Sequence, residues 1–448
     1  MIVPAPVSYE PLSGRGTPRE SAVTHRIDSA LAPEAYSLEV RDGVALASSS
    51  TPAGAAYAET TWRQLVALTQ GSEVDPVLVE DAPRFAYRGA MLDVARHFFG
   101  VADVCSYIDD LADLKINHLH LHLTDDQGWR LEIESWPELT RAGAATQVNG
   151  GGGGFYTAAD YSEIVAYADS RGITVIPEID LPGHTNAALV SYPHLADDGV
   201  ELAPYEGIEV GFSSLAIGKE ETYTFVADVL REVAALTPGP YLHIGGDECL
   251  QTPEADYLHC IARVTAMAAG LGKTVIGWHE MGRSRELPAG TIGQYWNLTT
   301  PEEAHGEHLI AFVKQGGQAI LSPADVAYLD QKYDENTDLG LTWSGPTSLP
   351  TAYGWEPTQV IPGLGEDDIL GLEAPMFTET VTTLDELRRL ALPRLAAFAE
   401  IAWSPQPAAG TERDFASFAA RLARLGREWR SRGITFEPVP EVEWEVEE

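Results

Sequence analysis

The sequence predicts an α/β protein built around a (β/α)₈ barrel, the TIM-barrel fold, with a small α+β domain in front of it. Eight apolar runs of strand length follow residue 85, and amphipathic helical stretches separate several of them. The predicted strands are Gly89–Val94, Asn117–Leu123, Ile173–Ile179, Tyr241–Gly245, Thr274–Trp278, Thr291–Trp296, Gln318–Ser322 and Ile369–Ala374. A doubly wound open sheet is the structural alternative, but no strand–helix junction carries the nucleotide-binding pattern G-x-G-x-x-G.

The helices are predicted from apolar residues that recur at helical spacing. One opens at Asp103, a suitable N-cap, and the others cover Ala159–Ser170, Thr222–Ala235, Ala255–Leu271 and Leu384–Phe398. Residues 1–84 differ, with short alternating runs at 36–41 and 43–47 and a helix over 57–68, and are predicted to form the small α+β domain. Residues 85–435 form the predicted barrel, and 436–448 an acidic C-terminal tail.

Length and charge limit the classes of function. The chain has 448 residues, with 67 Asp and Glu against 29 Lys and Arg, a formal net charge of -38. Such a polyanion is repelled by nucleic acids and anionic lipids, so neither is an expected partner. Three cysteines are too few for a disulfide framework, and no apolar stretch is long enough to span a membrane. The N-terminus lacks a signal-peptide pattern, which favours a cytoplasmic location, with secretion as the alternative.

Polar residues follow most of the predicted strands, where a barrel assembles its active site. They include carboxylates, one arginine and aromatic residues, which suit a neutral polyol: carboxylates accept protons from hydroxyls, and aromatic faces cover a sugar ring. These residues are Asp93, Arg96, Asp125, Asp126, Glu178, Asp180, His184, Asp247, Glu248, Trp278, Glu280, Trp296, Tyr328, Asp330, Glu373 and Glu379. A single such residue would be unremarkable on an acidic surface, but the pattern across seven strand ends predicts a site.

The most informative segment is His243-Ile-Gly-Gly-Asp-Glu248. Two glycines end a strand and let a ligand approach the backbone, and two carboxylates follow directly. Like charges this close raise at least one pKa, which keeps a proton available near neutral pH. Asp247 and Glu248 are therefore the predicted catalytic pair.

Histidines supply a second pattern, His118-Leu-His-Leu-His122, which places alternate side chains on one strand face. Such a strand could ligate zinc in a metal-dependent hydrolase. All three histidines, however, lie within the strand rather than beyond its end, so interior packing is the favoured interpretation and no metal is expected. His184 follows a strand and a Pro-Gly turn, and its neighbours Glu178 and Asp180 favour a functional role.

Three tryptophans are candidate walls of the pocket. Trp278 and Trp296 close predicted strands, which favours contact with substrate over core packing, and Trp343 is placed with them as a substrate-binding candidate. Cys249 adjoins Glu248, but no Cys–His arrangement indicates a thiolate nucleophile.

Several of these segments together resemble the family 20 glycoside hydrolases, in particular the bacterial exo-acting β-N-acetylhexosaminidases. The resemblance runs from about Phe85 to the last helix. It rests on segments in family order: Arg88-Gly-Ala-Met-Leu-Asp-Val-Ala-Arg-His97, His120-Leu-His-Leu-Thr-Asp-Asp-Gln-Gly-Trp129, Pro177-Glu-Ile-Asp-Leu-Pro-Gly-His184, His243-Ile-Gly-Gly-Asp-Glu248 and Glu373-Ala-Pro-Met-Phe-Thr-Glu379.

The resemblance implies a retaining exo-glycosidase that removes terminal β-linked N-acetylglucosamine or N-acetylgalactosamine without a cofactor. The 2-acetamido oxygen of the substrate would attack C1 and form an oxazolinium ion. Glu248 would act as acid and base, Asp247 and Tyr328 would hold the acetamido group, and Asp125 and His184 would tune Glu248. The substrate hydroxyls would bind Arg96, Asp330 and Glu379, and the acetamido methyl would lie between Trp278 and Trp296.

Two departures from the family pattern stand out. Phe377 occupies a position that is usually tryptophan, so a smaller ring would stack beneath the sugar. The N-terminal domain also looks abbreviated. Two alternatives remain at this stage: a metal-dependent hydrolase that uses His118, His120 and His122, and an inactive protein that binds amino sugars.

Overall fold

The structure is a computed structural model that describes residues 2–197, 199, 202–408 and 411–445. Eight parallel strands close into a barrel in the order β12-β13-β14-β15-β16-β17-β8-β9, which confirms the predicted fold class and excludes the open sheet. The barrel strands are β8 (Tyr87–Asp93), β9 (His118–His122), β12 (Thr174–Glu178), β13 (Tyr241–His243), β14 (Thr274–Trp278), β15 (Ile292–Tyr295), β16 (Ala319–Leu321) and β17 (Ile369–Met376).

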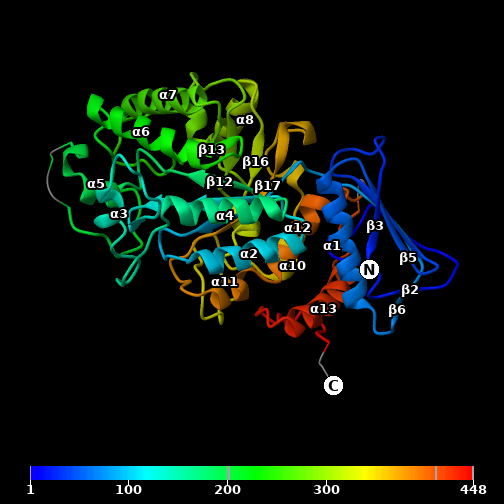
Figure 1. Cartoon of the computed structure of the whole chain (residues 1–448). Coiled ribbons are helices and arrows are strands. Elements are labelled where there is room, and N and C mark those ends of the chain that lie inside the picture. Colours follow the sequence, from blue (N-terminus) through cyan, green and yellow to red (C-terminus); the bar gives the residue numbers. More distant parts are fainter. Residues whose placement is uncertain (1, 198, 200–201, 409–410, 446–448) are drawn as a thin grey trace.

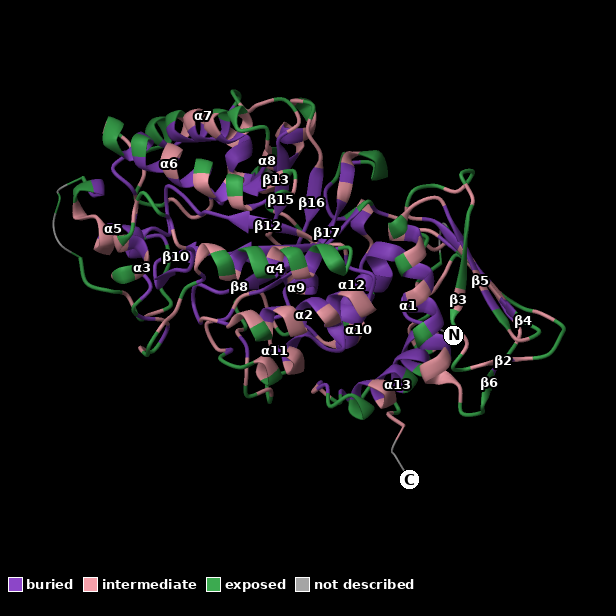
Figure 2. Cartoon of the chain, viewed as in Figure 1, coloured by how far each residue is buried: buried purple, intermediate pink, exposed green. Residues whose placement is uncertain are grey.

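Helices surround the barrel on its outer side (Figure 1). The longer ones are α2 (Val101–Asp113), α4 (Ala158–Ser170), α6 (Glu220–Leu236), α7 (Glu254–Gly270), α8 (Glu303–Lys314), α11 (Leu384–Ala391), α12 (Arg394–Trp403) and α13 (Phe415–Ser431). Short elements complete the loops: β10 (Thr124–Asp125), β11 (Gly128–Trp129), α3 (Glu138–Arg141), α5 (Asn186–Ser191), α9 (Ala324–Ala327), α10 (Leu349–Tyr353), and the 3₁₀ turns Pro193–Leu195, His279–Arg283, Pro357–Gln359 and Glu366–Asp368. Figure 2 shows the barrel strands buried and the surrounding helices with exposed residues on one side, as their amphipathic patterns require.

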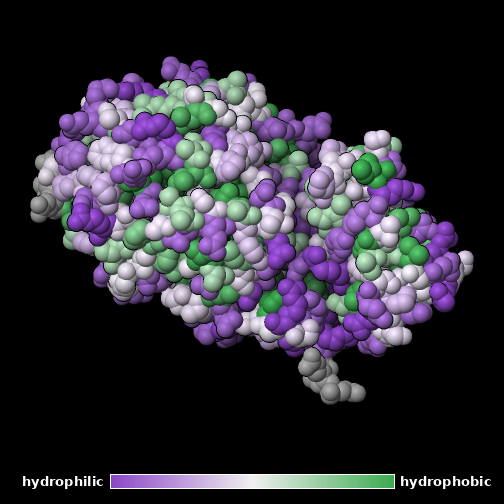
Figure 3. Space-filling view, in the orientation of Figure 1, coloured by the Kyte–Doolittle hydropathy of each residue, from purple (hydrophilic) through white to green (hydrophobic). Residues whose placement is uncertain are grey.

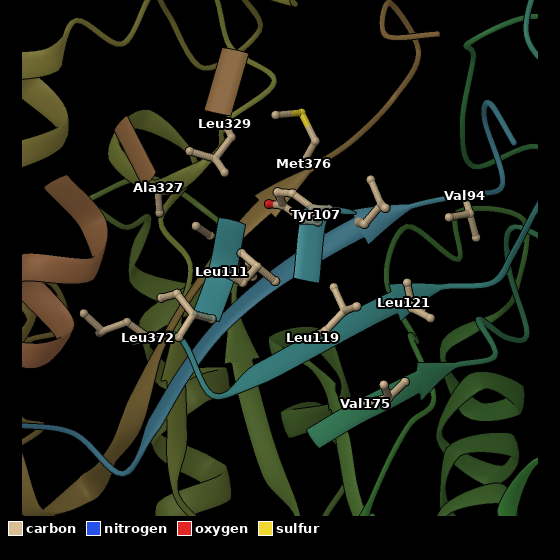
Figure 4. Packing of buried hydrophobic residues seen from close by; sticks show 14 of the residues in the cluster. Val94, Tyr107, Leu111, Leu119, Leu121, Val175, Ala327, Leu329, Leu372 and Met376 are labelled. Atoms are coloured by element: carbon tan, nitrogen blue, oxygen red, sulfur yellow. The ribbon is translucent and has the colours of Figure 1, made fainter. Parts of the chain in front are cut away.

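The main core lies between the barrel and its helices. Leu119 and Leu121 of β9 point outward and meet Tyr107 and Leu111 of α2, with Val175 of β12 beside them (Figure 4). All five side chains are at most 3% exposed. Alternation along β9 therefore sends its leucines outward and leaves its histidines inside the barrel.

The barrel interior changes from apolar to polar along its axis. Four isoleucines from four strands form a separate cluster with Tyr87: Ile176, Ile276, Ile292 and Ile320. Glu373 of β17 lies in a polar layer, where it accepts a hydrogen bond of 2.6 Å from Gln294 Nε2 and lies 2.8 Å from His120 Nδ1. This polar layer leads toward the carboxyl ends of the strands, where the candidate site lies.

Residues before the barrel form a five-stranded sheet in the order β1-β7-β4-β5-β3, packed against the helix α1 (Pro52–Leu68). Its strands are β1 (Ser8–Pro11), β3 (Val23–Ile27), β4 (Tyr36–Arg41), β5 (Val44–Ser49) and β7 (Val77–Asp81), and β2 (Thr17–Pro18) pairs with β6 (Glu73–Val74). Buried polar contacts join it to the barrel: Lys115 Nζ lies 2.8 Å from Asp81 Oδ2, and Trp403 Nε1 donates to Asp81 Oδ1 at 2.9 Å.

Three details differ from the sequence expectation. The cap of α2 is Gly100, and Asp103 instead lies in the first turn, where its charge favours the helix dipole. The helix predicted over 384–398 is two helices, α11 and α12, because Pro393 lacks the N–H group that would continue the first. The described part of the predicted tail packs against the barrel unit, with Phe436, Val439 and Val442 buried.

Hydrophilic residues dominate the face shown in Figure 3, and hydrophobic ones form small scattered groups. Among the residues that the structure describes, no helix is long and apolar enough to cross a membrane.

Candidate functional site

A cavity of about 770 Å³ lies at the carboxyl ends of the barrel strands. The twelve residues with predicted catalytic or substrate-binding roles line it: Arg96, Asp125, His184, Asp247, Glu248, Trp278, Trp296, Tyr328, Asp330, Trp343, Phe377 and Glu379. Five of the other acids predicted at strand ends do not line it: Asp93, Asp126, Glu178, Glu280 and Glu373. The lining also includes His122, Asp180, Ile208, Val210, Leu341 and Thr342. Residues that are up to 283 positions apart in the sequence therefore meet in one cavity.

The backbone after β13 places the acid pair. Gly245 and Gly246 have φ values of 69° and 94°, and Glu248 follows at 45°, so the chain turns sharply as soon as the strand ends. A Cβ on Gly245 would lie 1.8 Å from Asp180 Oδ1, which excludes any side chain there. The Gly246 N–H donates to the same oxygen at 3.0 Å, and the Tyr257 hydroxyl donates to the Gly246 carbonyl at 2.6 Å. The glycines are therefore required by both conformation and space.

A chain of charged side chains runs along one wall. Arg96 Nη2 lies 2.9 Å from Asp125 Oδ2, and His184 Nδ1 lies 3.2 Å from Asp125 Oδ1. The positive charges of Arg96 and His184 hold the pKa of the Asp125 carboxyl well below its usual range, despite its burial. Asp125 is therefore ionised, and it fixes the orientation of the His184 ring.

His184 connects this chain to the acid pair. Its Nε2 lies 3.5 Å from Glu248 Oε2 and 3.9 Å from Asp247 Oδ2. Burial would lower the pKa of His184, but Asp125 and other nearby carboxylates raise it well above its usual value. Burial raises the pKa of Asp247 to about 6, an effect that His184 opposes and the charge of Glu248 reinforces. A protonated imidazole thus lies beside both carboxyl groups, and Asp247 changes protonation near pH 6.

Two further acids that line the cavity, Asp330 and Glu379, are poised to bind hydroxyl groups. Burial and the negative charge of Glu379 raise the pKa of Asp330 to about 8, and burial also raises the pKa of Glu379. Asp330 Oδ2 accepts a hydrogen bond of 2.8 Å from Gln331 Nε2. A protonated acid can donate as well as accept, as recognition of a polyol requires.

Aromatic rings enclose the rest of the cavity. Trp278 is 1% exposed, whereas Trp343 is 52% exposed and lies at the rim. The rings of Trp343 and Trp296 meet edge to face with centroids 6.1 Å apart, and Tyr328 lies 5.7 Å from Trp343 and 5.5 Å from Phe377. These faces can cover the apolar side of a sugar.

Several buried polar atoms in the cavity have no hydrogen-bond partner among the described residues. They are Arg96 Nε, His184 Nε2, Asp247 Oδ1 and Glu379 Oε2. Unsatisfied buried polar atoms destabilise a protein by about 1–3 kcal/mol each. Their position around one cavity indicates a polar ligand that supplies the missing partners.

The histidine strand does not form a common ligand set. His118 stacks on Tyr87 at 4.2 Å, His120 contacts Glu373, and His122 Nε2 lies 2.9 Å from Asp125 Oδ2. Alternate residues of a strand are about 6.6 Å apart, too far for three of them to bind one zinc ion. Other groups in the described chain have closer ligand atoms, such as Asp180, His184 and Asp247. The carboxylates around His184 raise its pKa well above the usual value, however, and metal binding requires the neutral imidazole.

Sequence reasoning gave too little weight to three polar residues. His122, whose Nδ1 contacts Glu178, was assigned to packing, yet it lines the cavity and supports Asp125. Asp180 was noted only as a strand-end acid, although it anchors the glycine turn. Glu280 lies behind the wall and contacts Trp296. The sequence placed Asp180 and Glu280 after strands and His122 within one, but it did not show their partners.

Comparisons with known proteins agree with this geometry. Residues 85–406 match the family model described as glycosyl hydrolase family 20, catalytic domain. The chain is 45% identical over 413 residues to a β-N-acetylhexosaminidase of Cellulomonas fimi, an alignment that covers 92% of this chain and 82% of that protein.

Solved structures are similarly close. The GH20 β-N-acetylhexosaminidase of Streptomyces coelicolor A3(2) superposes with a TM-score of 0.93 at 42% identity, over 99% of this chain and 98% of that chain. A mutant β-hexosaminidase of Streptomyces plicatus in complex with the product GlcNAc superposes with a TM-score of 0.93 at 41% identity, over 99% and 97% of the two chains.

Proposed function

Because the chain belongs to glycosyl hydrolase family 20 and is a β-N-acetylhexosaminidase, we propose that it works by substrate-assisted catalysis with retention of configuration. It removes terminal, non-reducing β-linked N-acetylglucosamine or N-acetylgalactosamine from small oligosaccharides such as chitobiose, or from glycoconjugates. The nucleophile is the 2-acetamido oxygen of the substrate, so no protein side chain bonds to C1.

Glu248 carries the proton in both steps. As the acetamido oxygen attacks C1, the Glu248 carboxylic acid protonates the departing glycosidic oxygen and an oxazolinium ion forms. The Glu248 carboxylate then removes a proton from a water molecule, which attacks C1 and opens the oxazolinium ring. The protonated His184, 3.5 Å away, stabilises the carboxylate form between the steps.

Asp247 serves the acetamido group. Its ionised carboxylate orients the acetamido N–H and balances the positive charge that develops on that nitrogen, while the Tyr328 hydroxyl donates to the acetamido oxygen. The Oδ1 atom of Asp247 has no hydrogen-bond partner among the described residues and is available to accept from the acetamido N–H. With a pKa of about 6, Asp247 is ionised above that pH, so this contribution falls away as the pH drops through 6.

The remaining residues bind the sugar. Arg96, Asp330 and Glu379 bind hydroxyl groups, and Phe377 stacks beneath the ring. Trp278 and Trp296 enclose the acetamido methyl group, and Trp343 covers the leaving group at the rim. The observation that best supports the proposal is the set of buried, unpartnered polar atoms that face an aromatic-walled cavity beside the acid pair.

Aryl β-glycosides that differ only in the 2-substituent test this mechanism. The 2-acetamido glycoside should be hydrolysed at least 100-fold faster than the 2-hydroxy glycoside, because only the former carries the nucleophile. Asp247→Asn should reduce this preference. Equal rates on the two glycosides would contradict substrate assistance.

The same panel of glycosides also tests the two alternatives, a metal-dependent hydrolase and an inactive protein that binds amino sugars. Full activity after exhaustive chelation would eliminate a hydrolase that depends on metal at His118, His120 and His122. Binding of N-acetylglucosamine without turnover of any glycoside in the panel would instead identify a sugar-binding protein and refute the proposal.

A further inference from the structure

Glu280 lies directly behind one wall of the cavity. It follows β14 in the 3₁₀ turn His279–Arg283, and its side chain is only 17% exposed. The indole Nε1 of Trp296 donates to Glu280 Oε1 at 3.0 Å and to Oε2 at 3.1 Å. Trp296 lines the cavity, whereas Glu280 does not. The two residues are therefore in direct contact, and only one of them can reach a ligand.

Among the described residues, the ring of Trp296 also contacts Trp343 and His279. It follows β15 and is partly buried, and its edge-to-face contact is with Trp343, which is itself 52% exposed. On another side the His279 ring lies 5.5 Å away in a tilted contact. Such aromatic contacts tolerate rotation, whereas a hydrogen bond to the single indole donor fixes the direction of the ring.

We propose that Glu280 is a positioning residue that holds the Trp296 ring in place and thereby sets the size of the N-acyl group that the cavity accepts. The inference rests on the proposed function, in which Trp278 and Trp296 enclose the acetamido methyl group. A fixed wall admits an acetyl group and excludes a longer acyl chain. A wall that can rotate admits both.

The hydrogen bond, rather than a negative charge, is what Glu280 contributes. Burial and the nearby charge of Asp247 raise the pKa of Glu280 to about 8, so the carboxyl is largely neutral at neutral pH. A neutral glutamine offers the same acceptor oxygen at the same reach. Glu280→Gln should therefore preserve the position of Trp296, whereas Glu280→Ala removes the acceptor.

The test compares aryl glycosides that carry N-acetyl or N-propionyl groups. One methylene in a closed apolar pocket changes kcat/KM by about 10- to 200-fold, which is the expected preference of the wild type for acetyl. Glu280→Ala should reduce that preference at least fivefold and raise KM for the N-acetyl substrate. Glu280→Gln should keep the preference for acetyl within twofold of the wild-type value. Glu286→Ala removes an exposed acid near the same turn and is the matched control. It should change neither the preference for acetyl nor KM for the N-acetyl substrate.

A second variant tests the same hydrogen bond and does not depend on whether Glu280→Ala folds. Trp296→Phe keeps an aromatic ring but lacks the indole donor, so it should lose the preference for the acetyl group. The inference is overturned if Glu280→Ala or Trp296→Phe keeps the wild-type preference, or if Glu280→Gln loses it. A wild type that fails to hydrolyse the N-acetyl substrate would instead refute the proposed function.

Discussion

The charge of His184 offers the sharpest test of how this site controls protonation. Its Nε2 lies 3.9 Å from Asp247 Oδ2, and its positive charge is the largest charge effect that favours ionisation of Asp247. His184→Asn removes that charge. Asparagine suits the position because the backbone φ there is 54°, in the left-handed region that asparagine tolerates.

The size of the effect follows from the distance. Two unit charges about 4 Å apart interact by about 4 kcal/mol at an effective dielectric constant of about 20, which bounds the shift near three pKa units. Opposite charges at this range change a pKa by about 1–3 units. Loss of the imidazolium should therefore raise the pKa of Asp247 from about 6 to about 7–9. At pH 6 the ionised fraction, and with it kcat/KM, should fall about 5- to 500-fold.

The assay is the pH profile of kcat/KM on an aryl N-acetylglucosaminide, which reports the pKa values of the free enzyme. The acid limb should move upward in His184→Asn. His25→Asn, the same change at an exposed histidine beside Glu59, should leave the profile unchanged. An acid limb that stays near pH 6, with the rate lowered equally at every pH, would refute the electrostatic argument.

Other substitutions test the chemistry, the domain junction and the turn. Glu248→Gln should lower kcat on chitobiose by about 10²- to 10⁴-fold, and near-wild-type turnover would contradict its role as general acid. Lys115→Met leaves the buried Asp81 carboxylate without its cation and should destabilise the fold by about 3–5 kcal/mol, visible as a lower melting temperature in calorimetry. Gly245→Ala should lower both kcat/KM and the melting temperature, because its Cβ would overlap Asp180 and its φ of 69° disfavours alanine. An alanine variant with wild-type values for both would contradict the close approach.

Much of the fold could be predicted because its signals are local. Each barrel strand is a short apolar run, and the structure places every one within about three residues of its predicted bounds. The strands β1 and β7 were missed because they are short and partly polar, and they are stabilised by pairing with each other across the chain. The break between α11 and α12 was visible at Pro393, but the apolar periodicity on both sides concealed it.

The sequence by itself determined which end of the barrel carries the site and most of the polar residues that meet there. The alternation of strand and helix places the residues after each strand at one end of the barrel, and so Asp247, Glu248 and their companions had to meet. The tertiary structure decided how they are charged and held. Protonated His184, an acid of pKa about 6 at Asp247 and the contact between Glu280 and Trp296 depend on burial and on partners far along the chain. None of these three features exists until the barrel closes, because all of them depend on distances in space.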